Sequence, residues 1–259
     1  MTVRLPDDLN PLERLTVTPM SYSRLNTYKM CNAKYFYSYV LREPRQFAPY
    51  AVMGNIIHST FENVLTSEKT VSDLSEDILE EYKVQLGEWD PDDLIPEQLQ
   101  TDAVVMVNEF IDRHGDEQLP ITEKEIGFQI VIGSYIFRGY IDRLDVIGDM
   151  VYVIDWKTGK REVPLKHIAK DLQLGLYALA MNKLYPDKQV YASLYYLRSG
   201  RQKGHLFTQE DLVEVEKSLI EASDTLINDS HFHTTPNRFL CGFCDHAKSG
   251  TCPMGKYAK

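Results

Sequence analysis

The stretch GYIDRLDVIGDMVYVIDWKTGK, residues 139–160, decides the fold of this chain. It predicts two apolar strands that turn through Ile147-Gly148-Asp149, with Asp142 on the first strand and Asp155 and Lys157 on the second. Because side chains alternate between the faces of a strand, Asp155 and Lys157 point to the same side, and a hairpin brings Asp142 beside them. Buried charges on an apolar sheet are costly unless a divalent cation and a phosphate compensate them. The hairpin therefore predicts a functional site.

A salt-bridged strand pair is the alternative interpretation of these three charges, with Arg143 or Arg138 completing the network. Surface ion pairs are common and contribute little stability. The hairpin alone leaves both interpretations open.

The N-terminal part of the chain predicts two helices. Residues 1–19 are irregular, and Ser21 is a typical N-cap for a helix that runs to about Leu41 with an aromatic stripe. A second helix, from about Val52 to Thr66, carries His58, and Gly54 one turn earlier allows another chain or a ligand to approach closely. A single His in a helix is usually structural, so this signal is weak by itself.

Residues 71–114 predict a helical insertion. Two acidic, amphipathic helices span about Leu74 to Leu86 and about Gln98 to His114, and nothing in them resembles chemistry. We interpret them as a cover for one side of a substrate groove.

Beyond Thr122 the apolar period changes to two, which predicts strands. The predicted elements are strands at 126–132, 135–146, 150–156, 190–197 and 204–207, with a turn at Gly133-Ser134 and helices at 168–184 and 209–229. Their order predicts an α/β (α+β) fold with a central mixed sheet flanked by helices.

Composition bounds the class of protein. With 259 residues and 43% hydrophobic content, the chain suits one main domain, 1–259. It has no apolar run long enough to cross a membrane and no apolar core of a secretion signal, so we expect a soluble, cytoplasmic protein.

Charge argues against broad adhesion to nucleic acid, because the net charge is -10. A local basic groove is compatible with it, and so is a solvated charged loop. The basic residues in question are Lys157, Lys160, Arg161, Lys166 and Lys170.

The cysteines predict a metal site. In a reducing cytoplasm the four residues Cys31, Cys241, Cys244 and Cys252 favour metal ligation over disulfides. Cys-Pro, as at Cys252-Pro253, is frequent at iron-sulfur sites. Spacing alone leaves a four-cysteine zinc site and a [4Fe-4S] cluster both open. If Cys31 is the fourth ligand, the site ties residues 20–41 to residues 236–259 and closes a loop of about two hundred residues.

Taken together, these motifs resemble the RecB-like branch of the PD-(D/E)XK nuclease superfamily, close to the CRISPR-associated adaptation nucleases and the iron-sulfur exonuclease domain of AddB. The resemblance covers nearly the full chain, and the proline that precedes the first Asp in the written signature is replaced by Ile141. The matching residues are Ser23-Arg24-Leu25, Cys31, Tyr35, Gly54, His58, Gly139 to Arg143, Ile154 to Gly159, Gln173, Tyr177 and the terminal cysteines.

The resemblance implies a restriction-endonuclease-like core and a metal-dependent nuclease. Asp142, Asp155, His58 and the Trp156 carbonyl would hold Mg²⁺ or Mn²⁺, and Lys157 would orient the attacking water and offset charge on the phosphate. Gln173 and Tyr177 match the QxxxY motif of the family, which lines the active site. The resemblance also favours [4Fe-4S] over zinc at the four cysteines.

The implied function is an exonuclease that acts on single-stranded DNA or DNA ends, in recombination or repair, phage DNA processing or CRISPR adaptation. A recombination or CRISPR adaptation protein is an expected partner. The alternative is a catalytically silent module that binds DNA ends or a protein partner, which the acidic insertion favours. No GxxxxGK[ST] motif occurs, so any helicase activity must come from a partner.

Overall fold

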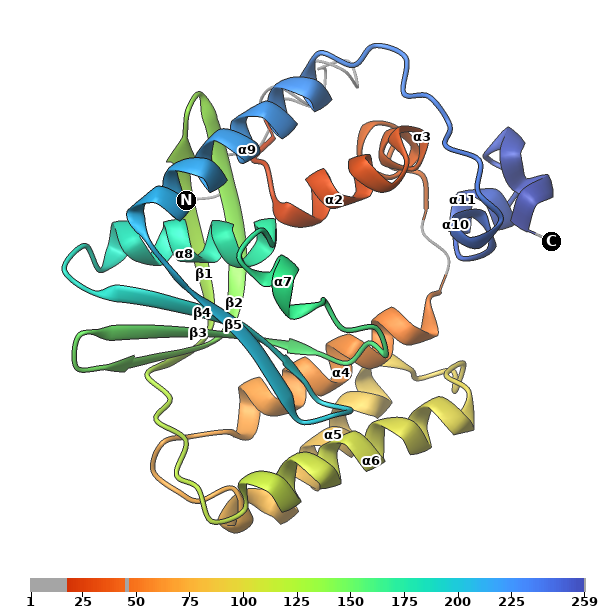
Figure 1. Cartoon of the computed structure of the whole chain (residues 1–259). Helices are drawn as coiled ribbons and strands as arrows, with labels where there is room; N and C mark the ends of the chain where they lie inside the picture. The colour runs from red at the N-terminus through yellow and green to blue at the C-terminus, as the bar shows by residue number, and fades with distance from the viewer. Residues whose placement is uncertain (1–17, 45–46, 259) are drawn as a thin grey trace. The chain divides into compact units, whose positions relative to one another are not determined.

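The computed structural model describes residues 18–44 and 47–258 (Figure 1). The predicted irregular segment 1–19 lies outside the described residues, apart from its last two positions. The described chain forms two compact units. One unit, which we name the sheet unit, comprises residues 47–128 and 140–215, and the other, the cysteine unit, comprises residues 18–44, 129–139 and 216–258.

A five-stranded sheet runs in the order β1-β2-β3-β4-β5. β2 and β3 pair antiparallel, β3 and β4 pair parallel, and β4 and β5 pair antiparallel. The predicted mixed sheet with flanking helices is therefore confirmed. The strands are β1 (Glu123–Ile132), β2 (Tyr135–Ile147), β3 (Met150–Lys157), β4 (Gln189–Tyr196) and β5 (Arg201–Phe207).

The hairpin between β2 and β3 turns through Gly148 and Asp149, as predicted. Gly148 has a φ of 54°, a conformation that glycine adopts without the steric cost of a Cβ. β1 and β2 are joined by the predicted turn at Gly133, whose φ is 57°. Both tight turns fix the register of the strands that carry Asp142 and Asp155.

Three helices pack together in the sheet unit and bury an aromatic cluster. They are α4 (Pro49–Val64), α5 (Ser75–Trp89) and α6 (Glu97–His114). Their bounds agree with those of the predicted helices to within about three residues. The rings of Phe61, Phe110, Trp156 and Tyr195 contact one another at centroid distances of 4.6 to 6.1 Å. Apolar burial on this scale anchors the helical insertion to β3 and β4.

The crossover between β3 and β4 contains two helices, α7 (Leu165–Ile168) and α8 (Leu172–Leu184). The sequence predicted one helix over 168–184, and this was wrong at its start. Asp171 interrupts it, because its side chain accepts hydrogen bonds from the amides of Gln173 and Leu174 as the N-cap of α8. α8 packs against β3 and β4, and a crossover of this kind is what a parallel pair requires.

The cysteine unit begins with three short helical segments, α2 (Tyr22–Met30), α3 (Asn32–Tyr35) and the π-helix η1 (Phe36–Val40). The predicted single helix from Ser21 to Leu41 was therefore wrong in its continuity. Ser21 does cap α2, but Cys31 is extended, with φ of -166° and ψ of 115°. The amide of Ala33 instead donates to the carbonyl of His233, which joins this break to the C-terminal segment.

The rest of the cysteine unit follows β5. α9 (Gln209–Ile227) belongs to it from residue 216 onward, and α10 (Arg238–Gly242), α11 (Asp245–Lys248) and η3 (Pro253–Ala258) complete it. Asp229, just after α9, accepts hydrogen bonds from Tyr28 and Asn32 at 2.8 and 2.9 Å. No helix in residues 18–44 and 47–258 is long and apolar enough to cross a membrane.

Candidate active site and cysteine cavity

Seven predicted site residues come together in the sheet unit. His58 lies on α4, Asp142 on β2, and Asp155, Trp156 and Lys157 on β3, while Gln173 and Tyr177 lie on α8. Side chains of the hairpin therefore contact both α4, which precedes it in the sequence, and α8, which follows it.

His58 and Trp156 both contact Asp142. Nδ1 of His58 lies 3.1 Å from Oδ1 of Asp142, and the amide of Trp156 donates to Oδ2 at 2.7 Å. Burial lowers the pKa of His58, but the hydrogen bond and the charge of Asp142 outweigh it, so that this pKa is raised. The Asp142 carboxylate is therefore held between a helix and the neighbouring strand.

Asp155 and Lys157 form a buried ion pair, in which Nζ of Lys157 lies 2.5 Å from Oδ2 of Asp155. Only 4% of Asp155 is exposed. Oδ2 has no hydrogen bond of good geometry, so the lysine charge is its only compensation among the described residues. Burial and the nearby Asp142 raise the pKa of Asp155, against the effect of Lys157. Such a carboxylate is poised to accept a further positive charge.

Gln173 connects this ion pair to α8. Its Oε1 accepts from Nζ of Lys157 at 2.9 Å, and its Nε2 donates to Oδ1 of Asp155 at 3.0 Å and to the hydroxyl of Tyr177 at 2.9 Å. Tyr177 donates to the same oxygen of Asp155 at 3.4 Å. Burial raises the pKa of Tyr177, which keeps its hydroxyl protonated. One amide thus fixes the relative positions of the carboxylate and the lysine.

Arg143 does not complete a salt-bridge network with these residues. It forms a bidentate pair with Asp145, at 2.9 and 2.6 Å, and both side chains are buried. Residues two apart on β2 share a face, so Arg143 and Asp145 lie on the face opposite to Asp142. The alternative interpretation with Arg143 as the partner of the hairpin carboxylates is therefore wrong.

Metal binding needs a rearrangement of this cluster. Within the described parts of the chain, no group of three His, Cys, Asp or Glu side chains is placed to hold a metal ion. The local contacts supply the reason, because Lys157 lies against one oxygen of Asp155 and Gln173 and Tyr177 contact the other. A divalent cation would have to displace the lysine from Oδ2.

Sequence reasoning missed the residues that hold the loop after β3. Nε of Arg198 donates to the carbonyl of Thr158 at 2.9 Å, and Glu162 pairs with Arg201 and Lys203 at 2.8 and 2.9 Å. These contacts join residues about forty positions apart, and no local period reveals them. The sequence did indicate one approach to this loop, at Gly54 of α4. A Cβ at Gly54 would lie 3.4 Å from Oγ1 of Thr158.

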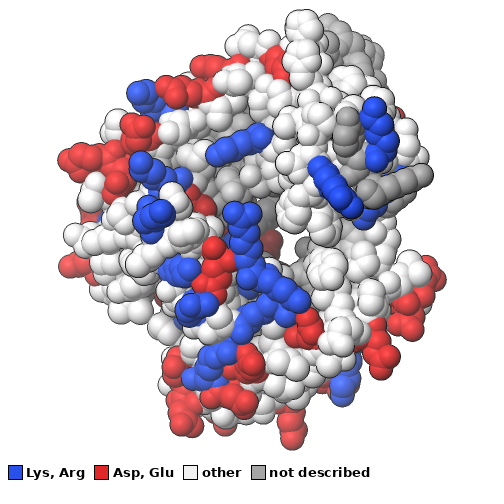
Figure 2. Space-filling model, turned by 45° about the vertical axis from the view of Figure 1, so that its right-hand side comes forward, with Lys and Arg blue, Asp and Glu red and all other residues white. Residues whose placement is uncertain are grey.

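Four of the five basic residues that the sequence singled out follow β3, and the fifth, Lys157, is its last residue. The exposed side chains of Lys160, Arg161, Lys166 and Lys170 form no hydrogen bond or ion pair within the described residues. Figure 2 shows a band of Lys and Arg side chains on the face in view. A band of this kind is compatible with DNA phosphates, although the chain carries a net charge of -10.

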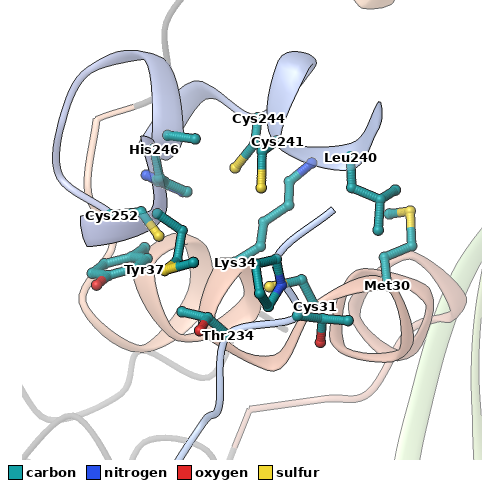
Figure 3. A pocket seen from close by; sticks show the side chains of 14 residues that line it. Met30, Cys31, Lys34, Tyr37, Thr234, Leu240, Cys241, Cys244, His246 and Cys252 are labelled. Atoms are coloured by element: carbon teal, nitrogen blue, oxygen red, sulfur yellow. The ribbon is translucent and has the colours of Figure 1, made fainter. Parts of the chain in front are cut away.

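All four cysteines line one cavity of the cysteine unit, together with Lys34, Tyr37 and His246 (Figure 3). All four are free thiols. The side chains of Cys241 and Cys244 lie side by side, and the side chain of Lys34 extends among the group. Burial raises the pKa of the Cys252 thiol, and the three other cysteines add to this effect. The structure thus brings together the four residues that the sequence singled out, without a formed metal-ligand set.

A mixed sheet with Asp142, Asp155 and Lys157 gathered at one hairpin defines a nuclease-like α/β protein. The family model of the PD-(D/E)XK nuclease superfamily matches residues 19–252. The chain therefore belongs to this superfamily.

Two curated phage proteins are similar to part of the chain. The Gene 69 protein of Mycobacterium phage D29 is 29% identical over 137 residues, which cover 51% of this chain and 48% of that protein. The Gene 69 protein of Mycobacterium phage L5 is 30% identical over 138 residues, which cover 51% and 44%. The chain spans about half the length of the curated relatives that it matches.

A solved structure shares the fold over most of the chain. The crystal structure of a candidate exonuclease from Eubacterium rectale has a TM-score of 0.58 at 12% identity, covering 95% of this chain and 94% of that one. At this identity the similarity shows the fold alone.

Proposed function

We propose that this protein is a metal-dependent deoxyribonuclease, an exonuclease that hydrolyses phosphodiester bonds of single-stranded DNA or DNA ends. The observation that carries the proposal is the cluster of Asp142, Lys157 and the buried Asp155, held by Gln173. Two carboxylates and a lysine at one point on a sheet suit phosphoryl chemistry, in which charge develops on non-bridging oxygens. Membership in the nuclease superfamily supports the same conclusion.

The donor set fits Mg²⁺ or Mn²⁺, which prefer carboxylate and carbonyl oxygens. Asp142, Asp155, His58 and the carbonyl of Trp156 would hold the ion, and Oδ2 of Asp155 is the buried oxygen that lacks a hydrogen bond. When bound, the metal supplies Lewis acidity and lowers the pKa of a coordinated water.

Lys157 has the central role in the proposed mechanism. Its ammonium group would orient the attacking water and offset charge on the scissile phosphate. Gln173 keeps contact with the lysine through Oε1 and therefore limits how far the ammonium group moves. Tyr177 and Gln173 retain their contacts with Oδ1 of Asp155, which holds the carboxylate in place.

We further propose that the four cysteines bind a [4Fe-4S] cluster, with structural zinc as the alternative. Four free thiols around one cavity support a shared cofactor. Cys-Pro at Cys252-Pro253, which is frequent at iron-sulfur sites, supports the cluster over zinc. The thiolates would be charged, and Lys34 is the cation that extends among them (Figure 3).

The two curated relatives support a proposal for the biological role. We propose the RecB-like branch of the superfamily and a role in recombination or repair, phage DNA processing or CRISPR adaptation. The phage origin of both curated relatives favours phage DNA processing. The alternative, a silent DNA-end or protein-binding module, retains the support of the acidic insertion at residues 71–114.

Digestion of DNA labelled separately at each end, with and without Mn²⁺, tests the nuclease directly. We expect cleavage only with the metal, and a loss of at least about 100-fold in Asp155→Ala, Lys157→Ala and Asp142→Ala, because the aspartates would hold the metal and the lysine would offset charge on the phosphate. Lys83→Ala is the matched control, since this lysine is exposed on α5 and should leave the rate unchanged.

Full metal-dependent cleavage by Asp155→Ala would contradict the assignment of the site. Absence of any cleavage by the unmodified chain, with DNA binding retained, would favour the silent module.

A further inference from the structure

Two aromatic side chains of the cysteine unit are exposed to solvent, Phe239 on α10 and Phe243 directly after this helix. Phe239 is 69% exposed and Phe243 is 66% exposed, and their ring centroids lie 5.4 Å apart with an angle of 62° between the rings. Asn237 fixes the start of this helix, because its side chain accepts from the amides of Phe239 and Leu240. The two rings therefore form a defined surface feature on a capped helix.

The opposite side of α10 explains why the rings face outward. Cys241 is buried, and Cys241 and Leu240 both line the cysteine cavity. The amide of Cys244 donates to the carbonyl of Cys241, which holds the turn that follows the helix. With one side committed to the cavity, residues four apart on the other side must project into solvent.

Exposure of two phenylalanine rings at one point is unfavourable unless a ligand covers them. Burying a Phe side chain is worth about 1.5–3 kcal/mol relative to leaving it in water. Paired exposed rings are thus a typical signal of an interaction surface. An aromatic ring also offers a flat face on which a nucleobase stacks.

The charged residues around the two rings indicate which kind of partner the surface would bind. Segment 231–258, which contains both rings, has three basic residues and one acidic residue, and segment 18–44 of the same unit has four basic residues and one acidic residue. Insertion 71–114, by contrast, has thirteen acidic and two basic residues. The chain is acidic as a whole, yet its exposed aromatic pair lies in a basic part and directly beside the exposed Arg238. A polyanion with flat apolar groups is complementary to this surface.

We propose that Phe239 and Phe243 stack on unpaired bases of single-stranded DNA, while Arg238 contacts the adjacent phosphate. The proposal rests on the proposed function, since it takes DNA as the substrate, and it narrows the substrate class to a single strand or a single-stranded end. Duplex DNA hides the faces of its bases, so it cannot use the rings in this way. The angle between the rings suits two successive bases that are splayed apart.

DNA binding is measured with the full chain that carries Asp155→Ala, purified anaerobically and kept free of divalent metal. Because this variant should not cleave DNA, the measurement separates binding from catalysis. The probes are a fluorescent oligothymidylate and a duplex of equal length. We expect the Phe239→Ala/Phe243→Ala variant to bind the single strand at least about 30-fold more weakly, which corresponds to about 1 kcal/mol for each of two stacked bases. Its affinity for the duplex should stay unchanged.

A tryptophan probe reports stacking itself. In Phe243→Trp, oligothymidylate should quench the new indole fluorescence, whereas the duplex should not. Trp89→Ala is the matched control, because Trp89 is 43% exposed but lies in the acidic insertion, and its loss should leave binding to both DNAs unchanged. Phe239→Tyr/Phe243→Tyr should retain single-strand affinity, since both rings remain.

Unchanged single-strand affinity in the double alanine variant, or an equal loss for both DNAs, would overturn the proposal. Unchanged affinity together with improved solubility would indicate a protein partner for the rings instead. If the double alanine variant does not fold, the quenching of Phe243→Trp decides, and absence of quenching overturns the proposal. Failure of the nuclease assay leaves these binding results intact, so the two failures are distinguishable.

Discussion

At the scale of single residues, Gln173 is the side chain on which the candidate active site depends most. It contacts Lys157, Asp155 and Tyr177 at once, and it is the neutral group between a buried acid and a buried base. A hydrogen bond to a charged group contributes about 1.5–3 kcal/mol, more than a bond between neutral groups. Loss of Gln173 should therefore release both ends of the ion pair.

We expect Gln173→Ala to lower kcat for DNA cleavage about 10- to 100-fold, which corresponds to the loss of one or two hydrogen bonds to charged groups. KM should change little, because Gln173 is placed to position Lys157 and Asp155 and not to bind distant phosphates. Steady-state cleavage at varied DNA concentration measures both constants.

Tyr177→Phe is the comparison, since it removes a single hydroxyl whose contact with Asp155 is long, at 3.4 Å. Its effect should be smaller than that of Gln173→Ala. An equal or larger loss in Tyr177→Phe would show that Gln173 is not the main positioning group.

The facing of the side chains in the β2–β3 hairpin could largely be predicted from their alternation along a strand. Alternation placed Asp155 and Lys157 on one face, and the same rule would have paired Arg143 with Asp145, two positions apart on β2. The contact between His58 and Asp142 could not be predicted in this way. It depends on the orientation of α4, which no local pattern specifies.

At the scale of elements, the close approach of α8 and α9 within the sheet unit rests on one glycine. A Cβ at Gly175 would lie 2.7 Å from both methyl carbons of Val215, closer than real contacts allow. Residues 174–181 of α8 are all buried, so this helix has no solvent-facing side that could absorb a shift. Gly175 is therefore required here by close packing.

We expect Gly175→Ala to destabilise the protein by about 1–3 kcal/mol through overpacking. Val215→Ala alone should also destabilise, because it removes two buried methyl groups. The double variant should be more stable than the sum of the two effects predicts, since the smaller residue at 215 accommodates the new methyl group. Urea unfolding followed by circular dichroism measures all three. Additive effects would contradict the proposed contact.

The sequence pattern did not predict two helix boundaries, the start of α8 and the break at Cys31. α8 is buried on all sides, so its apolar residues show no clear helical period, and the short α7 before it was merged with it in the prediction. The break at Cys31 was invisible for a different reason. The residues on both sides of it favour a helix, but the amide of Ala33 bonds to a carbonyl about two hundred positions away.

At the scale of the whole molecule, the four cysteines were the clearest long-range prediction. The sequence proposed that Cys31 joins the C-terminal three, and all four line one cavity. The identity of the cofactor could not be derived from spacing, because zinc and iron-sulfur sites share cysteine ligands. The single domain that the length favoured stays a prediction, and the structure divides into two compact units.

Removal of the cofactor should unfold the C-terminal segment. We expect anaerobically purified protein to be brown and to contain iron, and Cys31→Ser to lose the cofactor as completely as Cys244→Ser, since both thiols line the cavity. Iron content, visible absorption and limited proteolysis of residues 231–258 measure this effect. Ser38→Ala is the matched control, because it removes only a hydrogen bond to His246. A colourless protein with stoichiometric zinc, or Cys31→Ser with full cofactor, would contradict the proposal.

The parallel pairing of β3 with β4 has a consequence for the order in which the chain folds. The β2–β3 hairpin is local and closes through a two-residue turn, but β4 can pair with β3 only after α7 and α8 have crossed over. Loop closure makes such non-local pairing slower than hairpin formation. Because Gln173 and Tyr177 lie on that crossover, the cluster should be complete only when the sheet is complete. A chain still emerging from the ribosome would then carry both carboxylates and the lysine without the assembled cluster.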